Sequence, residues 1–288
     1  MNLLVILLQV LRSALRTLKL VRSGIGFAGA PVRRRIKSLE NTHLGQDCYI
    51  FGDGVSIKYF DLAKFSDKCG ISVGVIPHHR QFEETAIRYW ILPEPMFFWP
   101  VLRRGPYTSR RDRARFQNFF KPSPQMKKRV TCLLNLTNFP VGASRNTFYF
   151  FDRLPTTRPH VFSDKSIDYF AGSINASLTL AAYLGFRRAY LVGFDYTHNP
   201  PCAGHWYEIG PGIPQEFDSY NRNFFSWIEQ HLEVVTVVPT PQETFLHSVD
   251  YQSLTGADLG YRENTDLMSI DELKELAVWT DYRIFPKD

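Results

Sequence analysis

The sequence lacks several features that would assign it quickly to a class of protein. None of its four cysteines belongs to a C-x-x-C pair, and its histidines do not have the spacing of a metal-ligand set. No internal repeat or low-complexity segment interrupts the 288 residues. These absences argue against a zinc-binding domain, a disulfide-stabilised secreted domain and a repeat protein. Widely spaced cysteines in apolar surroundings indicate buried thiols in a reducing compartment.

Acidic residues are absent before Glu40, a segment that carries only basic charge. Its basic residues are Arg12, Arg16, Lys19, Arg22, Arg33, Arg34, Arg35 and Lys37. The eight positive charges of this segment exceed the formal net charge of +6 of the whole chain, so the rest of the chain is slightly acidic. A second basic cluster runs from Arg103 to Arg129, with Asp112 as its sole acid. Such local charge indicates a particular anionic surface or substrate rather than nucleic-acid binding.

A long apolar run is also missing from the N-terminal segment. The uncharged stretch ends at Arg12 and is shorter than the roughly 20 apolar residues that cross a bilayer. No charged residue precedes this stretch, whereas a signal peptide has a positively charged segment before its apolar run. Residues 2–22 instead place leucines on one helical face beside a basic stripe. We expect residues 1–38 to form a basic amphipathic arm on the inner face of the cell membrane, with the protein cytoplasmic and peripheral. Docking of this helix on the protein's own core or on a partner is the alternative.

Short apolar runs alternate with helical patterns through the remainder of the chain, which is 44% hydrophobic in all. The expected strands are 48–52, 71–76, 89–92, 130–136, 148–151, 189–194 and 234–238. The expected helices are a short one at 60–65 and longer ones at 166–186 and 215–231. This alternation predicts an α/β fold with a mostly parallel, Rossmann-like sheet flanked by helices. Residues 39–288 would form a single domain with an irregular insertion around 94–127.

One stretch organises this domain, because an apolar run from Tyr49 to Phe51 ends abruptly in Gly52-Asp53-Gly54. Glycine has no Cβ and tolerates φ > 0, so backbone here can approach a ligand closely. In open α/β sheets such a turn at the carboxyl end of a strand is where nucleotides and phosphates bind. The G-x-G-x-x-G fingerprint is incomplete, however, and a plain tight turn remains the alternative.

Three blocks of sequence resemble a known family. Residues 41–62 are similar to the "GNGPSL…DL" opening of bacterial family 42 glycosyltransferases, the sialyltransferases that use CMP-activated sugars. Residues 172–195, with Leu-Gly-Phe-Arg-Arg-Ala-Tyr-Leu-Val-Gly-Phe-Asp at their end, are similar to that family's serine-bearing helix and the strand after it. Residues 234–241 with Phe245 match its late strand. The same blocks also resemble a wider Rossmann-like group that includes 6-hydroxymethylpterin diphosphokinases.

The resemblance implies a GT-A-like α/β domain that binds a nucleotide-sugar, CMP-linked in the family, without a metal or another cofactor. The sequence agrees on the metal, since no Asp-x-Asp stands at a strand end. By the resemblance, Gly52, Asp53, Gly54 and Ser56 line the donor's phosphate and ribose. Gly172 and Ser173, at the start of the long helix, contact the nucleotide, where free N–H groups favour an anion.

The transfer chemistry needs a base that takes a proton from the acceptor hydroxyl. Histidine suits this task because its pKa lies near working pH. The candidate is His205, on the loop after the strand that ends at Asp195, and His198 in the same loop is the second choice. Tyr196 and Tyr207 would hydrogen-bond the departing phosphate, as tyrosines do in the family. Asp195 is expected to hold the loop rather than to react.

Departures from the family pattern concern the donor. The family has asparagine where this chain has Asp53, and a carboxylate cannot donate a hydrogen bond. Gly74–Pro77 replace another expected asparagine, and Phe170 stands where an arginine is expected. Arg153 or Arg158 could supply that positive charge. These departures leave two alternatives for the donor: a sialic-acid-like sugar or a different sugar.

We accordingly expect a metal-independent glycosyltransferase that moves a sugar to a cell-surface glycan or a lipid-linked acceptor. A pyrophosphokinase-like transferase, which would need ATP and Mg²⁺, is a second hypothesis. A third is a non-catalytic nucleotide-binding protein on the same fold.

Overall fold

The computed structural model describes residues 34–94, 97–98, 118–141, 143–150, 172–216, 221–278 and 282–286. The helix expected at 2–22 and most of the insertion expected at 94–127 lie outside these residues, as do Arg153, Arg158 and Phe170.

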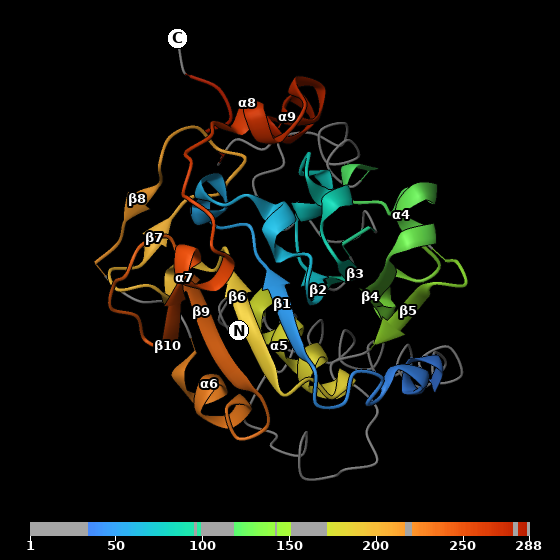
Figure 1. Ribbon diagram of the computed structural model, residues 1–288. Coiled ribbons are helices and arrows are strands. Elements are labelled where there is room, and N and C mark those ends of the chain that lie inside the picture. The colour runs from blue at the N-terminus through green and yellow to red at the C-terminus, as the bar shows by residue number, and fades with distance from the viewer. Residues whose placement is uncertain are drawn as a thin grey trace, which may run out of the picture.

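One sheet of eight parallel strands forms the centre of the fold (Figure 1). Its strands are β1 (Asp47–Phe51), β2 (Cys69–Ser72), β3 (Ile87–Leu92), β4 (Thr131–Asn135), β5 (Thr147–Phe150), β6 (Arg188–Val192), β9 (Glu233–Val238) and β10 (His247–Asp250). Their order is β10-β9-β6-β1-β2-β3-β4-β5, and every neighbouring pair is parallel. The prediction of a mostly parallel α/β sheet is confirmed.

The strand order contains a reversal beside β1. From β1 the chain moves outward through β2, β3, β4 and β5, and then returns to place β6 on the other side of β1. The connections on the two sides therefore diverge at the carboxyl ends of β1 and β6. In open α/β sheets this is the place where a crevice opens for a ligand.

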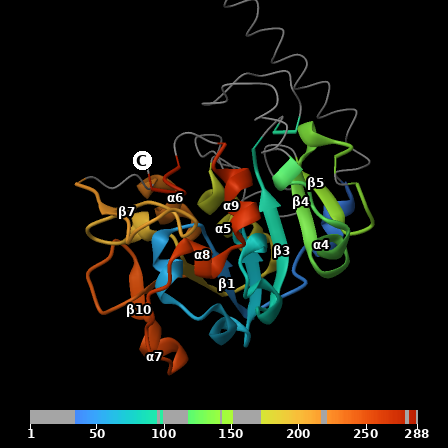
Figure 2. The ribbon, with the colours of Figure 1, turned by 90° about the horizontal axis from the view of Figure 1, so that it is seen from above.

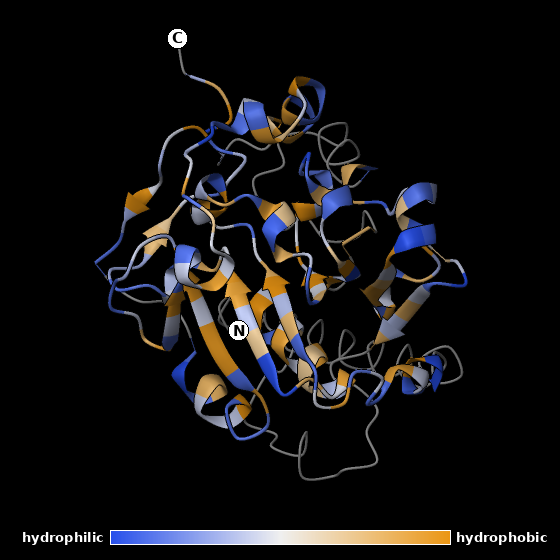
Figure 3. Ribbon diagram, in the orientation of Figure 1, coloured by the Kyte–Doolittle hydropathy of each residue, from blue (hydrophilic) through white to orange (hydrophobic). Residues whose placement is uncertain are grey.

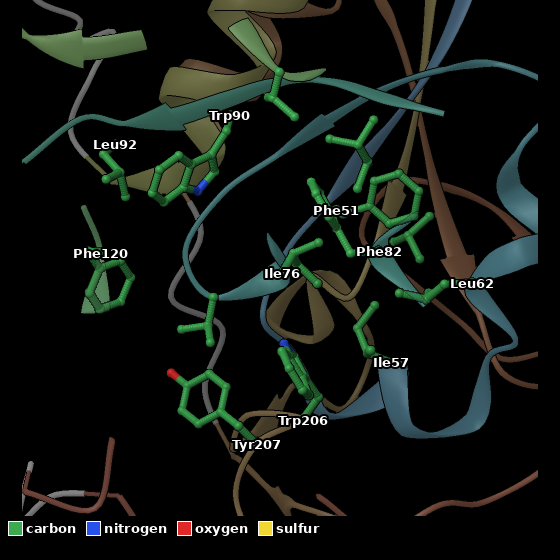
Figure 4. Close-up of a cluster of buried hydrophobic side chains, with 14 of the residues drawn as sticks. Phe51, Ile57, Leu62, Ile76, Phe82, Trp90, Leu92, Phe120, Trp206 and Tyr207 are labelled. Atoms are coloured by element: carbon green, nitrogen blue, oxygen red, sulfur yellow. The ribbon is translucent and has the colours of Figure 1, made fainter. Parts of the chain in front are cut away.

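Both faces of the sheet are buried, which explains why the strands are apolar runs rather than alternating sequences. In β1, Tyr49 and Phe51 belong to one core cluster, whereas Cys48 and Ile50 belong to the other. Figure 3 shows the central strands mostly in hydrophobic colours and the outer helix α4 (Pro124–Arg129) in hydrophilic ones. Figure 4 shows the first cluster, in which Phe51, Trp90 and Trp206 lie together although they are far apart in the sequence.

Different kinds of helix cover the two faces. Core residues of α5 (Ser173–Leu184) and α6 (Arg222–Ile228) pack on one face. The other face is covered by 3₁₀ turns and by helices from the C-terminal part of the chain. These elements are η2 (Val55–Tyr59), η3 (Leu62–Phe65), η4 (Ile76–His78), η5 (Phe82–Glu84), α7 (Tyr251–Thr255), α8 (Asn264–Leu267) and α9 (Ile270–Leu276). Helix α4 lies beside β4 and β5 at one edge, and α7 lies next to β10 at the other (Figures 1 and 2).

Several boundaries differ from those predicted. The strand expected at 71–76 ends at Ser72, because Gly74 turns the chain with a φ of 50°. The helix expected at 215–231 begins at Arg222, where the Asn221 side chain accepts from the backbone N–H of Phe224. Of the helix expected at 166–186, the described part is Ser173–Leu184, and Gly185 ends it in the left-handed conformation.

The remaining elements include the start of the described chain, η1 (Arg35–Leu39), together with η6 (Leu136–Asn138), η7 (Asp195–Thr197) and the short antiparallel pair β7 (Cys202–Ala203) and β8 (Ile213–Pro214). Ile36 is fully buried in the core, so residues assigned to the arm at 35–38 contact the folded domain. No helix in the described part of the chain combines the length and apolar character that a membrane crossing requires.

Candidate active site at the ends of β1 and β6

Glycines allow the ends of β1 and β6 to interlock. The N–H groups of Gly52 and Gly54 donate to the carbonyls of Val192 and Gly193 at 2.8 and 2.7 Å. A Cβ at either glycine would lie 2.6 Å from the Gly193 carbonyl oxygen. The space beside Gly52 is thus filled by the protein itself, and that glycine serves strand packing rather than approach to a ligand.

Asp53 lies between these two glycines and is half-buried. It accepts hydrogen bonds from the backbone N–H of Val75 at 3.0 Å and from the Trp206 indole N–H at 3.3 Å. Gly74 leaves room for it, since a Cβ there would be 1.6 Å from a carboxylate oxygen. Burial raises the pKa of Asp53 to about 6, although the nearby His205 opposes the shift. This carboxyl group can therefore be protonated under mildly acidic conditions.

The loop after β7 brings His205 onto the same turn. The backbone of His205 pairs with Gly54, and the N–H of Trp206 donates to the Asp53 carbonyl at 3.1 Å. The imidazole Nδ1 lies 2.7 Å from a carboxylate oxygen of Glu208. Because Glu208 holds Nδ1, the other ring nitrogen is the one available for proton transfer.

Glu208 is itself firmly placed. It also accepts from the backbone N–H groups of His205 at 2.8 Å and Arg283 at 2.9 Å. Burial alone would raise the pKa of Glu208, but these bonds outweigh it and lower the pKa. The residue is thus ionised at neutral pH and can stabilise a protonated His205, as the third member of a catalytic triad does.

A cleft of about 200 Å³, here called the switch-point cleft, opens where these elements meet. Predicted site residues on its wall are Asp53, Gly54, Ser173, Asp195, Tyr196 and His205. They come from the ends of β1 and β6, the start of α5 and the loop after β7. The sequence led us to expect that Gly52, Gly54 and Ser173 converge on one hollow near His205. Gly54, Ser173 and His205 line this cleft, whereas Gly52 does not.

Helix α5 directs its first turn toward this cleft. Its N-cap residue, Gly172, adopts a φ of 84° and has no side chain with which to cap the helix. Neither the cap nor the first turn carries an acid, and Ser173 lines the cleft. Free N–H groups and the helix dipole at such an end favour an anion.

Asp195 forms the wall beside Ser56. Its carboxylate accepts from the backbone N–H of Ser56 at 2.7 Å and also from the Ser56 hydroxyl. It is almost completely buried, and these bonds tie the loop after β6 to the turn at Ser56. Burial also raises the pKa of the neighbouring Tyr196, so its hydroxyl stays protonated and can donate.

Five predicted residues are not on this wall: Gly52, Ser56, Gly172, His198 and Tyr207. Tyr207 is buried in the core beneath His205, with the two rings stacked 4.9 Å apart. Its placement supports the imidazole instead of contacting a departing phosphate. Ser56 and His198 line a neighbouring cleft.

Sequence reasoning missed Glu208, Trp206 and Cys202, the last of which also lines the cleft. Glu208 carried a local signal, since it stands three residues after His205 in a loop. In the described part of the chain, no group of three His, Cys, Asp or Glu side chains is arranged to hold a metal ion.

No model of a known protein family matches the chain, and no curated protein does so. Among solved structures, it is similar to the MAf glycosyltransferase from Magnetospirillum magneticum AMB-1, with a TM-score of 0.39 and 17% sequence identity. The superposition covers 86% of this chain and 41% of that protein.

Proposed function

We propose that the protein transfers a glycosyl group from a nucleotide-sugar to an acceptor hydroxyl, with His205 as the general base. The observation that carries this proposal is the meeting of three features in the switch-point cleft: the start of α5, the Asp53–Gly54 turn and the His205–Glu208 pair. The sequence blocks that resemble family 42 glycosyltransferases, at 41–62 and 172–195, contain the first two of these features.

Nucleotide binding is supported by the position and the chemistry of the cleft. It lies at the strand-order reversal, where open α/β sheets bind nucleotides. The first turn of α5 at Ser173 would receive the phosphate, and the rings of Phe194 and Tyr196 offer apolar surface for the nucleoside. Asp53 would donate a hydrogen bond to a phosphate oxygen only while it is protonated, below its pKa of about 6, whereas the asparagine that it replaces donates at any pH.

The transfer step uses one base and no metal. The acceptor oxygen forms a bond to the anomeric carbon as the bond from that carbon to the nucleotide's phosphate oxygen breaks. The electron pair of the broken bond leaves with the phosphate, whose charge the α5 terminus and the Tyr196 hydroxyl would stabilise. His205 takes the proton of the acceptor hydroxyl, and Glu208 stabilises the resulting imidazolium.

A thermal-shift panel of CMP-, UDP-, GDP- and dTDP-sugars tests donor binding. One donor class should raise the melting temperature of the wild type. The Ser173→Asp variant should lose this effect, because its carboxylate would repel the phosphate, while an acid in a helix's first turn leaves the fold intact. A donor that stabilises both proteins equally would place binding outside the α5 terminus.

Two rival functions give different results in the same system. A pyrophosphokinase-like transferase needs ATP and Mg²⁺, so turnover that stops in EDTA would favour it. Binding of a donor without turnover over a broad acceptor panel would favour a non-catalytic nucleotide-binding protein.

A further inference from the structure

A second cleft of about 220 Å³ lies next to the switch-point cleft. Pro200, Pro201, Pro214 and Pro239 form most of its apolar wall, and we call it the proline cleft. Asp195 and Cys202 belong to the walls of both clefts. Each volume alone is below the roughly 300 Å³ at which small-molecule sites begin, and the two together exceed that value. The two adjacent clefts together are therefore large enough to form one small-molecule site with two compartments.

The polar groups of the proline cleft include a buried histidine with an unused nitrogen. His198 is only 5% exposed, and its Nε2 has no hydrogen-bond partner among the described residues. Burial lowers the pKa of this imidazole, so it is neutral at pH 7. Gln242 adds an exposed amide to the same wall. A ring nitrogen and an amide suit a hydroxyl group, which both donates and accepts hydrogen bonds.

The two clefts differ in the groups that could bind a phosphate or a nucleobase. Neither described wall has a lysine or an arginine and both include Asp195, but only the switch-point cleft has the start of a long helix. Apart from the His198 imidazole, it has no aromatic ring on which a nucleobase could stack. Phe194, Tyr196 and the start of α5 all belong to the switch-point cleft.

We propose that the proline cleft binds an uncharged, hydroxyl-bearing sugar ring, the acceptor of the transfer, with His198 Nε2 and the Gln242 amide contacting its hydroxyls. Its identity as the acceptor compartment rests on the proposed function. Proline rings would cover the apolar C–H face of the sugar, and a donor in the switch-point cleft would lie across Asp195 from it.

Two adjacent tryptophan variants test this assignment. Pro214 lines the cleft, whereas Ile213, the preceding residue of β8, is exposed and is not on the wall. Pro214→Trp should fill the cleft, and Ile213→Trp is its matched control, because neighbouring strand residues point to opposite faces. Saturation-transfer NMR would measure binding of methyl glycosides of glucose, galactose and N-acetylglucosamine, with the corresponding sugar phosphates and free nucleosides as comparison ligands.

We expect the wild type and Ile213→Trp to bind at least one methyl glycoside, and Pro214→Trp to bind it at least tenfold more weakly. His198→Gln should weaken it too, whereas nucleotide binding should be unchanged in all variants. Equal glycoside binding by Pro214→Trp, no glycoside binding by the wild type, or loss of nucleoside binding instead would overturn the assignment. If nucleotides fail to bind but glycosides behave as expected, the proline cleft stands and the transferase proposal fails.

Discussion

At the scale of single residues, the most unusual group in the switch-point cleft is the Asp53 carboxyl, because its pKa is raised. Asp53 is half-buried, and its bonds to Val75 and Trp206 do not offset the cost of partly removing an ionised group from water, so its pKa rises to about 6. The folded protein therefore holds a proton on Asp53 more tightly than the unfolded chain, in which the pKa is near 3.8. Ionisation of this residue consequently destabilises the fold.

We predict that Asp53→Asn changes the free energy of unfolding by about 2–3 kcal/mol more favourably at pH 8 than at pH 4, since each pKa unit corresponds to about 1.4 kcal/mol. The raised pKa sets the sign: the wild type loses stability against the variant as pH rises from about 4 to 6, and the difference is constant above about 7. Urea unfolding at both pH values measures it. Asp271→Asn, at a fully exposed carboxylate, is the control. A pH-independent difference would contradict the account.

At the scale of elements, close packing of two strand ends shapes the cleft. Gly54 is adjacent to both Gly193 and the Asp195 carboxylate, with an added Cβ 2.6 and 2.7 Å from their nearest atoms. Since the contact with Gly193 is to a backbone atom, a Cβ at Gly54 could be accommodated only by shifting β1 against β6.

Gly54→Ala should therefore destabilise the protein by about 1–3 kcal/mol, the usual cost of overpacking. Gly260→Ala serves as the control, because a Cβ there meets nothing within 4 Å and its φ is not positive. Urea unfolding compares the two. Equal stability of the two variants would mean that the strand ends are not tightly interlocked.

Much of the sheet could be predicted because β1, β6 and β9 are compact apolar runs bounded by glycine or polar residues. Strand β10 was missed because His247–Asp250 is polar and partly exposed at the edge. The 3₁₀ turns between β1 and β3 have no helical period of apolar residues. His205 could be placed only through the family resemblance, and its partner Glu208 and the proline cleft depend on how the loop from 198 to 214 folds back.

At the scale of the whole molecule, the C-terminal segment holds the loop that carries His205. The Asn264 amide donates to the carbonyls of Tyr207 at 3.0 Å and Ile284 at 2.9 Å. The fully buried Lys58 binds Glu263 at 3.0 Å and the Gly210 carbonyl at 2.9 Å. Figure 1 shows α8 beyond the carboxyl ends of the central strands.

Asn264→Ala should cost about 1–3 kcal/mol, because it leaves two buried carbonyls without their donor. It should also lower turnover, since the loop with His205 and Glu208 loses an anchor. Gln252→Ala, at an exposed amide on α7, is the control and should change neither quantity. Full activity and stability in Asn264→Ala would show that this segment does not support the site.

The basic arm at 1–38 stays a prediction about the intact protein. Its basic residues are each worth about 1 kcal/mol at an anionic membrane surface, an attraction that salt screens. The full chain should sediment with vesicles containing phosphatidylserine at low salt and not with neutral vesicles. Deletion of residues 1–30 should abolish this binding, and retained binding would assign it to another surface.

The most direct test of the proposed chemistry is the turnover of His205→Ala at a saturating concentration of whichever nucleotide-sugar binds. We predict a kcat that is about 10²–10⁴-fold lower, with an unchanged calorimetric Kd for the donor, because the imidazole accepts a proton and does not hold the nucleotide. His231→Ala, at an exposed histidine after α6, should behave as the wild type. Wild-type turnover in His205→Ala would remove this histidine from the reaction and with it the central claim.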